Sequence, residues 1–378
     1  SLMEANQTTL DYRVEHSKFI IGSNRAGSGN LLDWSTGLAF DHHRGHLFVA
    51  DRNNHRVQVF STDQDGSLVG SFGSPGDQPG QLTNPWGIAI DYEYERIFIT
   101  DQGNNRVQVW SLRDHSFLSC IGACGTGDLE FRYPEAITID RHRRRAIIAD
   151  TFNNRLQVLS LSDLSFLFAI GKQGHQPGEF YHPSGVAIDH ERDRLIVVDI
   201  NNNRIQVLSA NDGSFLFSVG SEGSRLGQLM NPQGTCIDNQ GRIIVADNIN
   251  GRLQAFTPEG HAISALGYLP AMPWCVAFDE HRGLIGFSAG NQVHVIRANQ
   301  WLADTYTWRP DLHRYAPESF KQAVFTLALI RSLVHESPLS MLPNELLFEI
   351  LTMIGCEATG SRQSAAARSK SKGQCLLS

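Results

Sequence analysis

Cysteines, charged residues and long hydrophobic runs are all scarce in this 378-residue chain, and each shortage excludes a class of protein. Of the 6 cysteines, Cys120 and Cys124 are close together, but no second Cys or His pair stands at zinc-finger spacing. Neither a disulfide framework nor a RING-type zinc domain is therefore expected. No run approaches the roughly 20 apolar residues that a membrane-spanning helix needs. The first residues lack the basic and apolar pattern of a signal peptide. We expect a cytoplasmic protein with reduced thiols.

The chain contains few charged residues, and they are unevenly distributed along it. Charged residues make up 19% of the chain, and the net charge is −7. Four of the 32 basic residues lie after residue 360, where no Asp or Glu occurs, so the preceding residues hold 28 basic against 39 acidic groups. The resulting charge of −11 disfavours general affinity for nucleic acid, which depends mostly on neutralising phosphates.

A repeat of about 50 residues dominates the sequence. The string Asp-Arg-Asn-Asn-His-Arg-Val-Gln-Val at residues 51–59 returns with small changes at Asp101, Asp150, Asp199 and Asp247, with spacings of 50, 49, 49 and 48 residues. A second string, typified by Gly-Ile-Ala-Ile-Asp at 87–91, precedes each copy and appears a sixth time at 275–279. The chain is therefore built from repeated supersecondary units.

Each unit contains four short β-rich runs, which in the third unit are 136–140, 146–150, 155–159 and 166–170. Their apolar period is two, and turn residues separate them, which is typical of propeller blades and excludes a helical solenoid. The sixth unit supplies only three runs, whereas 18–22 is a spare one near the N-terminus. The sequence thus predicts an all-β fold, a six-bladed β-propeller over 18–300 that this N-terminal strand closes, since an open ring would expose two sheet edges.

The two strings together resemble the NHL repeat over residues of about 18 to 298, although 289–292 departs from the pattern in the sixth blade. The resemblance implies a propeller that binds proteins or single-stranded RNA, often as the recognition end of a ubiquitin ligase, as in the TRIM-NHL proteins. Related propellers include the peptidylglycine amidating lyase and lactonase-type hydrolases, which implies catalysis as a further alternative.

The repeated Asp, Asn, Arg and Gln residues are interpreted as structural, because a function does not need the same set five times. Function is expected where the repeats differ, on the loops of one face. Residues before or at the start of each first strand and in the Asp–Arg loops should surround the mouth of the central channel. The candidate partner-binding residues are Trp34, Trp86, Tyr133, Glu135, His182, Trp274, Arg52, His55 and Phe152. Such aromatic residues dominate binding hot spots, although they could instead only pack blade against blade.

Three functions follow for the propeller. Recognition of a protein needs only this aromatic rim, and it is the function that we favour. Recognition of single-stranded RNA would use the same stacking surfaces. A metal-dependent lyase or hydrolase would need ligands that converge on the channel, yet only His182, or the set Glu135, Asn84 and Asn231, is suitably placed. Four other histidines should lie on the opposite face, in turns after first strands: His42, His43, His142 and His190. We therefore expect no catalytic residues, no metal and no cofactor, and a monomer.

Beyond the propeller, 301–356 is predicted to be helical, with apolar stripes over 317–334 and after Pro343. The stretch 342–351 resembles the opening of an F-box, the motif that docks on the Skp adaptor of cullin ligases. The resemblance implies docking through Leu342, Pro343, Leu346, Leu347, Ile350 and Leu351. The segment is also loosely similar to a SOCS box, although Arg331 stands where an elongin-binding Cys is expected. The alternative is a helical hairpin that packs on the propeller.

The two ends of the chain complete the predicted domain organisation. Residues 1–17 are expected to be an N-terminal extension, and 357–378 a disordered basic tail. The last four residues, from Cys375, fit the prenylation pattern of a Cys, two aliphatic residues and a terminal residue, here Ser. Upstream basic residues would supply the electrostatic signal that one lipid needs. Membrane association through Cys375 is therefore an additional expectation.

Overall fold

The computed structural model describes residues 9–11, 17–22, 31–63, 65–267 and 269–302. The chain divides into two units, Ser1–Ala303 and Asp304–Ser378. The predicted helical segment beyond residue 302, with the F-box-like stretch and the tail, lies outside the described residues. None of the described helices is long and apolar enough to cross a membrane.

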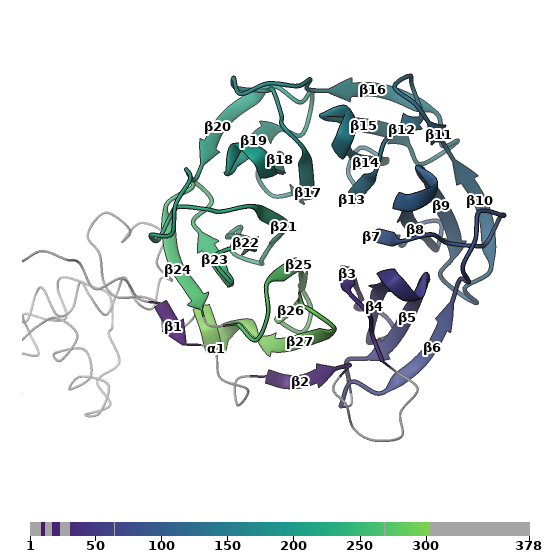
Figure 1. Cartoon of the computed structure of the whole chain (residues 1–378), viewed down its shortest axis with the longest axis horizontal. Coiled ribbons are helices and arrows are strands. Elements are labelled where there is room, and N and C mark those ends of the chain that lie inside the picture. The colour runs from purple at the N-terminus through teal and green to yellow at the C-terminus, as the bar shows by residue number, and fades with distance from the viewer. Residues whose placement is uncertain (1–8, 12–16, 23–30, 64, 268, 303–378) are drawn as a thin grey trace, which may run out of the picture. The chain divides into compact units, whose positions relative to one another are not determined.

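The first unit is a six-bladed β-propeller, as predicted (Figure 1). Each blade is an antiparallel sheet whose first strand lies next to the central channel. These inner strands are β3 (Ser35–Asp41), β7 (Pro85–Asp91), β13 (Pro134–Asp140), β17 (Pro183–Asp189), β21 (Pro232–Ile237) and β25 (Pro273–Asp279). The second strands are β4 (His46–Asp51), β8 (Arg96–Asp101), β14 (Arg145–Asp150), β18 (Arg194–Asp199), β22 (Ile243–Asp247) and β26 (Leu284–Ala289).

The third and fourth strands complete the sheet of each blade. The third strands are β5 (Arg56–Ser61), β9 (Arg106–Ser111), β15 (Arg155–Ser160), β19 (Arg204–Ser209), β23 (Arg252–Phe256) and β27 (Gln292–Arg297). In the first five blades the fourth strands are β6 (Leu68–Phe72), β10 (Phe117–Ile121), β16 (Phe166–Ile170), β20 (Phe215–Val219) and β24 (Ala262–Gly267). Fourth strands alternate between partly buried and exposed residues and end on a buried one, because one of their two sides meets water.

The sixth blade takes its fourth strand from the other end of the chain. Strand β2 (Ser17–Ile21) pairs antiparallel with β27, with Phe19 opposite Val295 and Ile21 opposite Val293. The predicted closure by an N-terminal strand is confirmed. A further strand, β1 (Thr9–Asp11), lies parallel to β24 and extends the fifth blade to five strands, inside the range expected to be only an extension.

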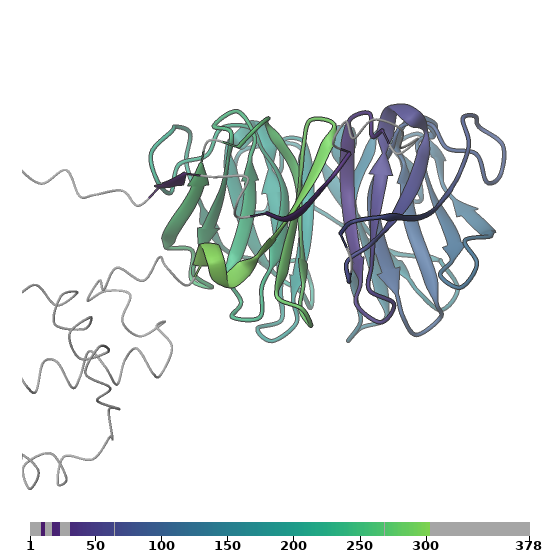
Figure 2. The same cartoon turned by 90° about the horizontal axis from the view of Figure 1, so that it is seen from below.

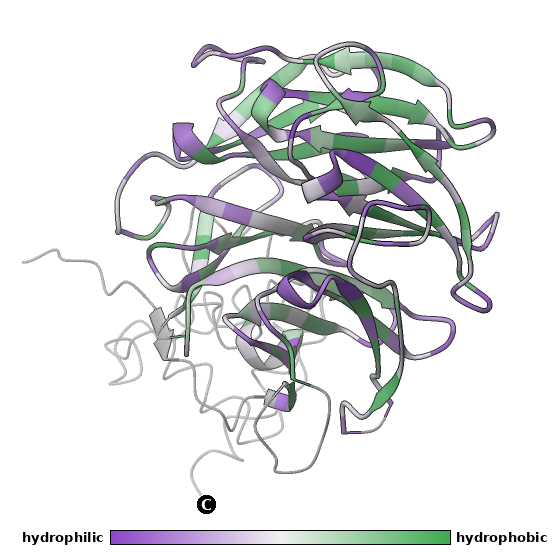
Figure 3. Ribbon diagram, turned by 45° about the vertical axis from the view of Figure 1, so that its right-hand side comes forward, coloured by the Kyte–Doolittle hydropathy of each residue, from purple (hydrophilic) through white to green (hydrophobic). Residues whose placement is uncertain are grey.

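The hydrophobic core lies between adjacent blades. One cluster joins Phe48 and Val59 of the first blade to Ile97 and Ile99 of the second, all of them buried. Figure 3 shows that most of the strand residues are hydrophobic, whereas the turns between the strands are mostly hydrophilic. Because each blade buries both sides of its sheet against neighbours, no blade is complete without the ring.

The repeated polar residues connect the strands within each of the first five blades. The Oδ2 atom of the buried Asp101 accepts hydrogen bonds from Arg106 Nε at 2.8 Å and from the side-chain amides of Asn104 and Gln108 at 2.9 Å. Its Oδ1 atom accepts one from Thr83 N at 2.7 Å. Equivalent sets surround Asp51, Asp150, Asp199 and Asp247. The interpretation that these residues are structural is confirmed.

Short helices and chain ends complete the unit. Four 3₁₀ turns link second to third strands: η2 (Arg52–Asn54), η3 (Gln102–Asn104), η4 (Thr151–Asn153) and η5 (Ile200–Asn202). A two-stranded pair, β11 (Ala123–Cys124) and β12 (Glu130–Phe131), lies between the second and third blades. Helix α1 (Ala298–Leu302) follows the sixth blade, and its buried Trp301 donates from Nε1 to Ser264 Oγ at 3.2 Å.

Candidate recognition surface at the channel mouth

The 3₁₀ turns and the residues before the inner strands share one face of the ring, which we call the mouth face. The turns between first and second strands lie on the opposite face, so the two faces carry different loops (Figure 2). The predicted placement of His42, His43, His142 and His190 on the opposite face is confirmed.

The residue just before each inner strand adopts an unusual backbone conformation. In five blades it has a positive φ between 51° and 58°, at Trp34, Asn84, Tyr133, His182 and Asn231. Asn tolerates this left-handed region, whereas bulky aromatic residues do so at a cost. The sequence pattern gave no sign of this strain, which clusters at functional sites in proteins.

An acceptor from the preceding blade holds each of these residues in place. Tyr133 N donates to Asn105 Oδ1 at 2.9 Å, and Trp34 N donates to Asn291 Oδ1 at 2.9 Å across the ring closure. In the second blade Asn84 N donates to His55 Nδ1 at 3.1 Å. The expected partner-binding residue His55 thus performs the task that Asn performs elsewhere, and its ring supports the rim.

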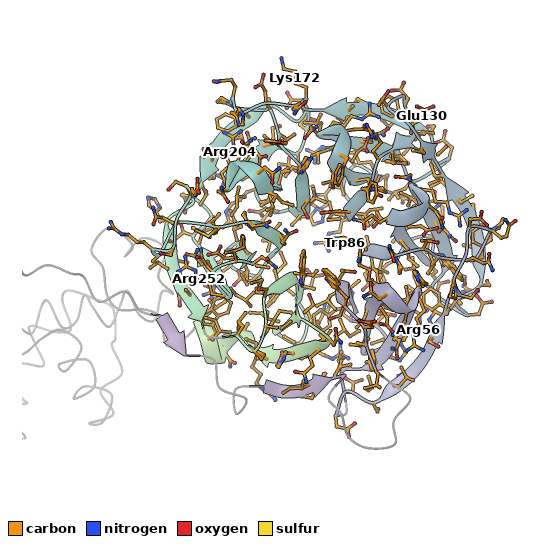
Figure 4. All side chains as sticks on the ribbon, in the orientation of Figure 1. Arg56, Trp86, Glu130, Lys172, Arg204 and Arg252 are labelled. Atoms are coloured by element: carbon orange, nitrogen blue, oxygen red, sulfur yellow. The ribbon has the colours of Figure 1, made fainter. Side chains whose placement is uncertain are left out.

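Three tryptophans and one arginine form the first part of the rim. The Trp274 ring centroid lies 5.3 Å from that of Trp34 and 5.9 Å from that of Trp86. The Arg52 guanidinium stands 5.1 Å from the Trp34 centroid and 5.4 Å from the Trp86 centroid, within the range of cation–π attraction. Figure 4 shows Trp86 near the centre of the ring, whereas the labelled Arg56, Arg204 and Arg252 lie further out.

A second aromatic group comes from the third and fourth blades. Phe152 lies 4.9 Å from Tyr133 and 4.6 Å from His182 between ring centroids. Tyr133 is 49% exposed and Phe152 45%, so both offer apolar surface to a partner. Burial lowers the pKa of His182 below its ordinary value of 6.5, and its Nδ1 lies 3.0 Å from Asn201 Nδ2.

Between these groups a polar chain crosses the channel wall. Arg52 Nη2 donates to Gln102 Oε1 at 3.3 Å, and Gln102 Nε2 donates to Glu135 Oε1 at 3.3 Å. Glu135 is buried, and this burial raises its pKa to about 7, although the charge of Arg52 acts in the opposite direction. Glu135 follows Tyr133 at the start of β13, but it is only 7% exposed, so its carboxylate is less accessible to a partner than the rim position suggested.

Two exposed hydrophobic residues complete the mouth face. Ile249 is 48% exposed and Met272 52%. They occupy the repeat positions of Phe152 and Tyr133 in the last two blades. The repeat pattern places Met272 at the mouth beside Trp274, whereas Ile249 was not among the candidate residues.

The channel contains a cavity that extends toward the opposite face. A cavity of about 810 Å³ lies among the inner strands and reaches their far turns, where His42, Tyr92 and Glu280 contribute to its lining. In the described part of the chain, the only three-membered group of His, Cys, Asp and Glu side chains that could share a metal ion is His42, Glu280 and His281 at this end.

Comparison with known families agrees with this geometry. A family model described as "6-bladed beta-propeller" matches residues 39–124, 92–169 and 126–220, and an NHL repeat model matches 229–256. The chain is therefore a six-bladed β-propeller in which residues 229–256 match the NHL repeat. No curated protein matches it significantly.

Solved structures share the fold at low sequence identity. A gluconolactonase from Xanthomonas campestris is 15% identical with a TM-score of 0.55, over 71% of this chain and 86% of that one. A streptogramin B lyase is 14% identical with a TM-score of 0.51, over 69% and 78%. A virginiamycin B lyase from Staphylococcus aureus is 14% identical with a TM-score of 0.51, over 72% and 82%. These likenesses show the fold alone.

Proposed function

We propose that this propeller is a non-enzymatic recognition module that binds a protein partner at its mouth face. The observation that carries the proposal is the tryptophan group, in which Trp34, Trp86 and Trp274 meet around Arg52. Trp and Arg are the residues that most often dominate protein interfaces. A rigid ring holds them, so little conformational entropy is lost on binding.

The surface suits an extended peptide segment with an aromatic or aliphatic anchor. Exposed apolar groups surround the mouth at Tyr133, Phe152, Ile249 and Met272. Arg52 supplies one cation for a carboxylate or a carbonyl of the partner. Binding of single-stranded RNA remains the second candidate because bases would stack on the same rings. The net charge of −7 disfavours it.

A metal-dependent hydrolase or lyase fits the mouth less well, although the similar structures include a gluconolactonase and a lyase by name. Among the candidate metal ligands at the mouth, Glu135 is the one that has a carboxylate. It lies beside the Arg52 guanidinium and Gln102. The positive charge of Arg52 acts against a divalent cation at the same place. The group of potential metal ligands found within the described ranges lies at the other end of the channel.

The link to ubiquitin ligation concerns residues beyond those that the structure describes. We propose that Leu342, Pro343, Leu346, Leu347, Ile350 and Leu351 dock a cullin-type adaptor, so that the propeller recruits a substrate to a ligase. Prenylation of Cys375 would attach the protein to a membrane, and Cys375→Ser should then abolish membrane partitioning.

Affinity purification of the tagged full-length protein from its own cells, followed by quantitative mass spectrometry, tests the proposal. We expect one or more partners whose recovery falls at least about tenfold in Trp86→Ala/Trp274→Ala. Tyr94→Ala is the matched control, since Tyr94 is a 49% exposed aromatic residue in a turn of the opposite face. Co-purified Skp, elongin or cullin subunits would support the adaptor role. Partners that vanish after ribonuclease treatment, or equal recovery by both variants, would contradict protein recognition at the mouth.

A further inference from the structure

The first and last blades meet on the opposite face through two turns that are far apart in the sequence. His42 follows β3, and Glu280 and His281 follow β25. One potential ligand atom from each of these three side chains lies within 4.8 Å of the other two. The rings of His42 and His281 are stacked, with centroids 4.0 Å apart and planes 10° from parallel.

Tyr92 of the second blade sets the orientation of His42. The Tyr92 hydroxyl donates its single proton to Phe40 O at 3.0 Å and lies 3.0 Å from His42 Nδ1. When the hydroxyl donates to Phe40 O, it accepts at the second contact from His42 Nδ1–H, and Nε2 then keeps its lone pair. A ring held by a hydrogen bond at one nitrogen, with the other nitrogen free to coordinate, is the usual arrangement of metal-binding histidines.

We propose that His42, Glu280 and His281 bind a Zn²⁺ ion. Two imidazoles and one carboxylate are a known three-ligand set for zinc, which leaves the fourth position to water or a ligand. With bonds of about 2.0–2.1 Å, a tetrahedral site needs ligand atoms about 3.3 Å apart. Small side-chain rotations achieve this, because the side chains of His281 and Glu280 are 56% and 43% exposed. The ion would have to displace the exposed ion pair that Arg141 forms with Glu280 Oε1 at 3.4 Å, and exposed pairs of this kind are weak.

An ion at this site would link the first and sixth blades, which meet where the ring closes. Its ligands come from the first and the sixth blade, and 238 residues separate His42 from Glu280. A cross-link that closes so long a loop restricts the unfolded chain. The 810 Å³ channel cavity reaches this site, since His42 and Glu280 help to line it. This site is independent of the mouth face, so its failure would leave the proposed recognition function intact.

Isothermal titration of the untagged full-length protein with ZnCl₂ tests the inference. We expect one saturable site, whose dissociation constant increases at least about tenfold in His281→Ala and in Glu280→Gln. Both residues are exposed, so neither change should impair folding. His142→Ala is the matched control, because His142 is an exposed histidine of the same face that lies outside the group. It should bind Zn²⁺ as the wild type does.

Two further readouts separate this site from the cysteines, of which Cys120 and Cys124 are exposed. Co²⁺ in place of Zn²⁺ should give the visible absorption of a tetrahedral site without a thiolate charge-transfer band. Zn²⁺ should raise the melting temperature of the wild type and of His142→Ala, but not of His281→Ala. Absence of saturable binding, a thiolate band, or equal binding by His281→Ala would overturn the proposal.

Discussion

The rings of Trp34 and Trp274 lie 5.3 Å apart, although one residue precedes the first blade and the other begins the last. Their contact lies at the seam of the ring, which is the junction between the sixth blade, completed by the N-terminal strand, and the first blade. Trp34 N is also bonded to Asn291 of the sixth blade. The proposed recognition surface therefore exists only in the closed propeller, which ties stability of the seam to binding.

Loss of the closing contacts should destabilise the whole propeller. Phe19 is 8% exposed and packs in the cluster that joins the sixth blade to the first. We expect Phe19→Ala to lower the free energy of unfolding by about 3 kcal/mol, measured by urea denaturation. Leu118→Ala, at a 51% exposed position of another fourth strand, should change it by less than about 0.5 kcal/mol. Equal effects would mean that β2 contributes no more than a surface strand.

Substitutions of structural residues and of proposed binding residues should differ in their effects on stability and on partner recovery. Asp101→Ala leaves Arg106 and the amides of Asn104 and Gln108 without their shared buried acceptor. We expect it to cost about 3–5 kcal/mol of stability. Trp86→Ala/Trp274→Ala should cost less stability than Asp101→Ala, while it lowers partner recovery at least about tenfold. Thermal unfolding together with the purification experiment measures both quantities. A loss of binding without a loss of stability in Asp101→Ala would contradict the structural role of the repeat.

A glycine allows adjacent inner strands to approach at the channel. A Cβ atom on Gly87 would lie 2.5 Å from Glu135 O and 3.0 Å from Ala136 Cα, and both are backbone atoms that cannot easily move. Gly87→Ala should therefore destabilise the protein by about 1–3 kcal/mol in urea denaturation. The control is Gly70→Ala in β6, where a Cβ meets nothing within 4 Å. It should be neutral or slightly stabilising. Tolerance of Gly87→Ala would show that the channel is wider than described.

The buried Glu135 should make stability depend on pH. Its pKa rises from 4.5 to about 7 on folding, so the folded state favours the protonated acid. This group therefore destabilises the protein increasingly as the pH rises from 4.5 through 7, by an amount on the order of 3 kcal/mol. Glu135→Gln should remove that part of the pH dependence, and it should be at least as stable as the wild type at pH 8. Urea unfolding at pH 5 and pH 8 measures this. An unchanged slope would mean that Glu135 is ionised throughout.

Much of the fold could be predicted because its determinants are local and repeated. The period of two in 87–91 and its copies defines each inner strand, and the fixed spacing of Asp101 and its equivalents counts the blades. The unmatched run at 18–22 predicted the closing strand, since the sixth unit supplies only three of the four runs that a blade needs. The same topology placed His42 and Trp34 on opposite faces.

The candidate site was only partly predictable. Repeat position placed Trp34, Trp86 and Trp274 at the channel mouth, but whether their rings meet depends on blade packing. Side-chain direction at Glu135 also depends on the neighbouring strands, so its burial beside Gln102 could not be foreseen. Nor did the sequence indicate that His55 would replace an asparagine as the acceptor for Asn84 N.

By itself, then, the sequence determined the number of blades, the closing strand and the identity of the residues on each face, because strand periodicity and turn chemistry act over a few residues. Only the tertiary structure decided which distant side chains meet. It brought Trp274 to Trp34, and His281 to His42, through the curvature that closes six blades into a ring. It also placed β1 beside β24. Such contacts arise from the summed packing of every blade against the next, which no single repeat encodes.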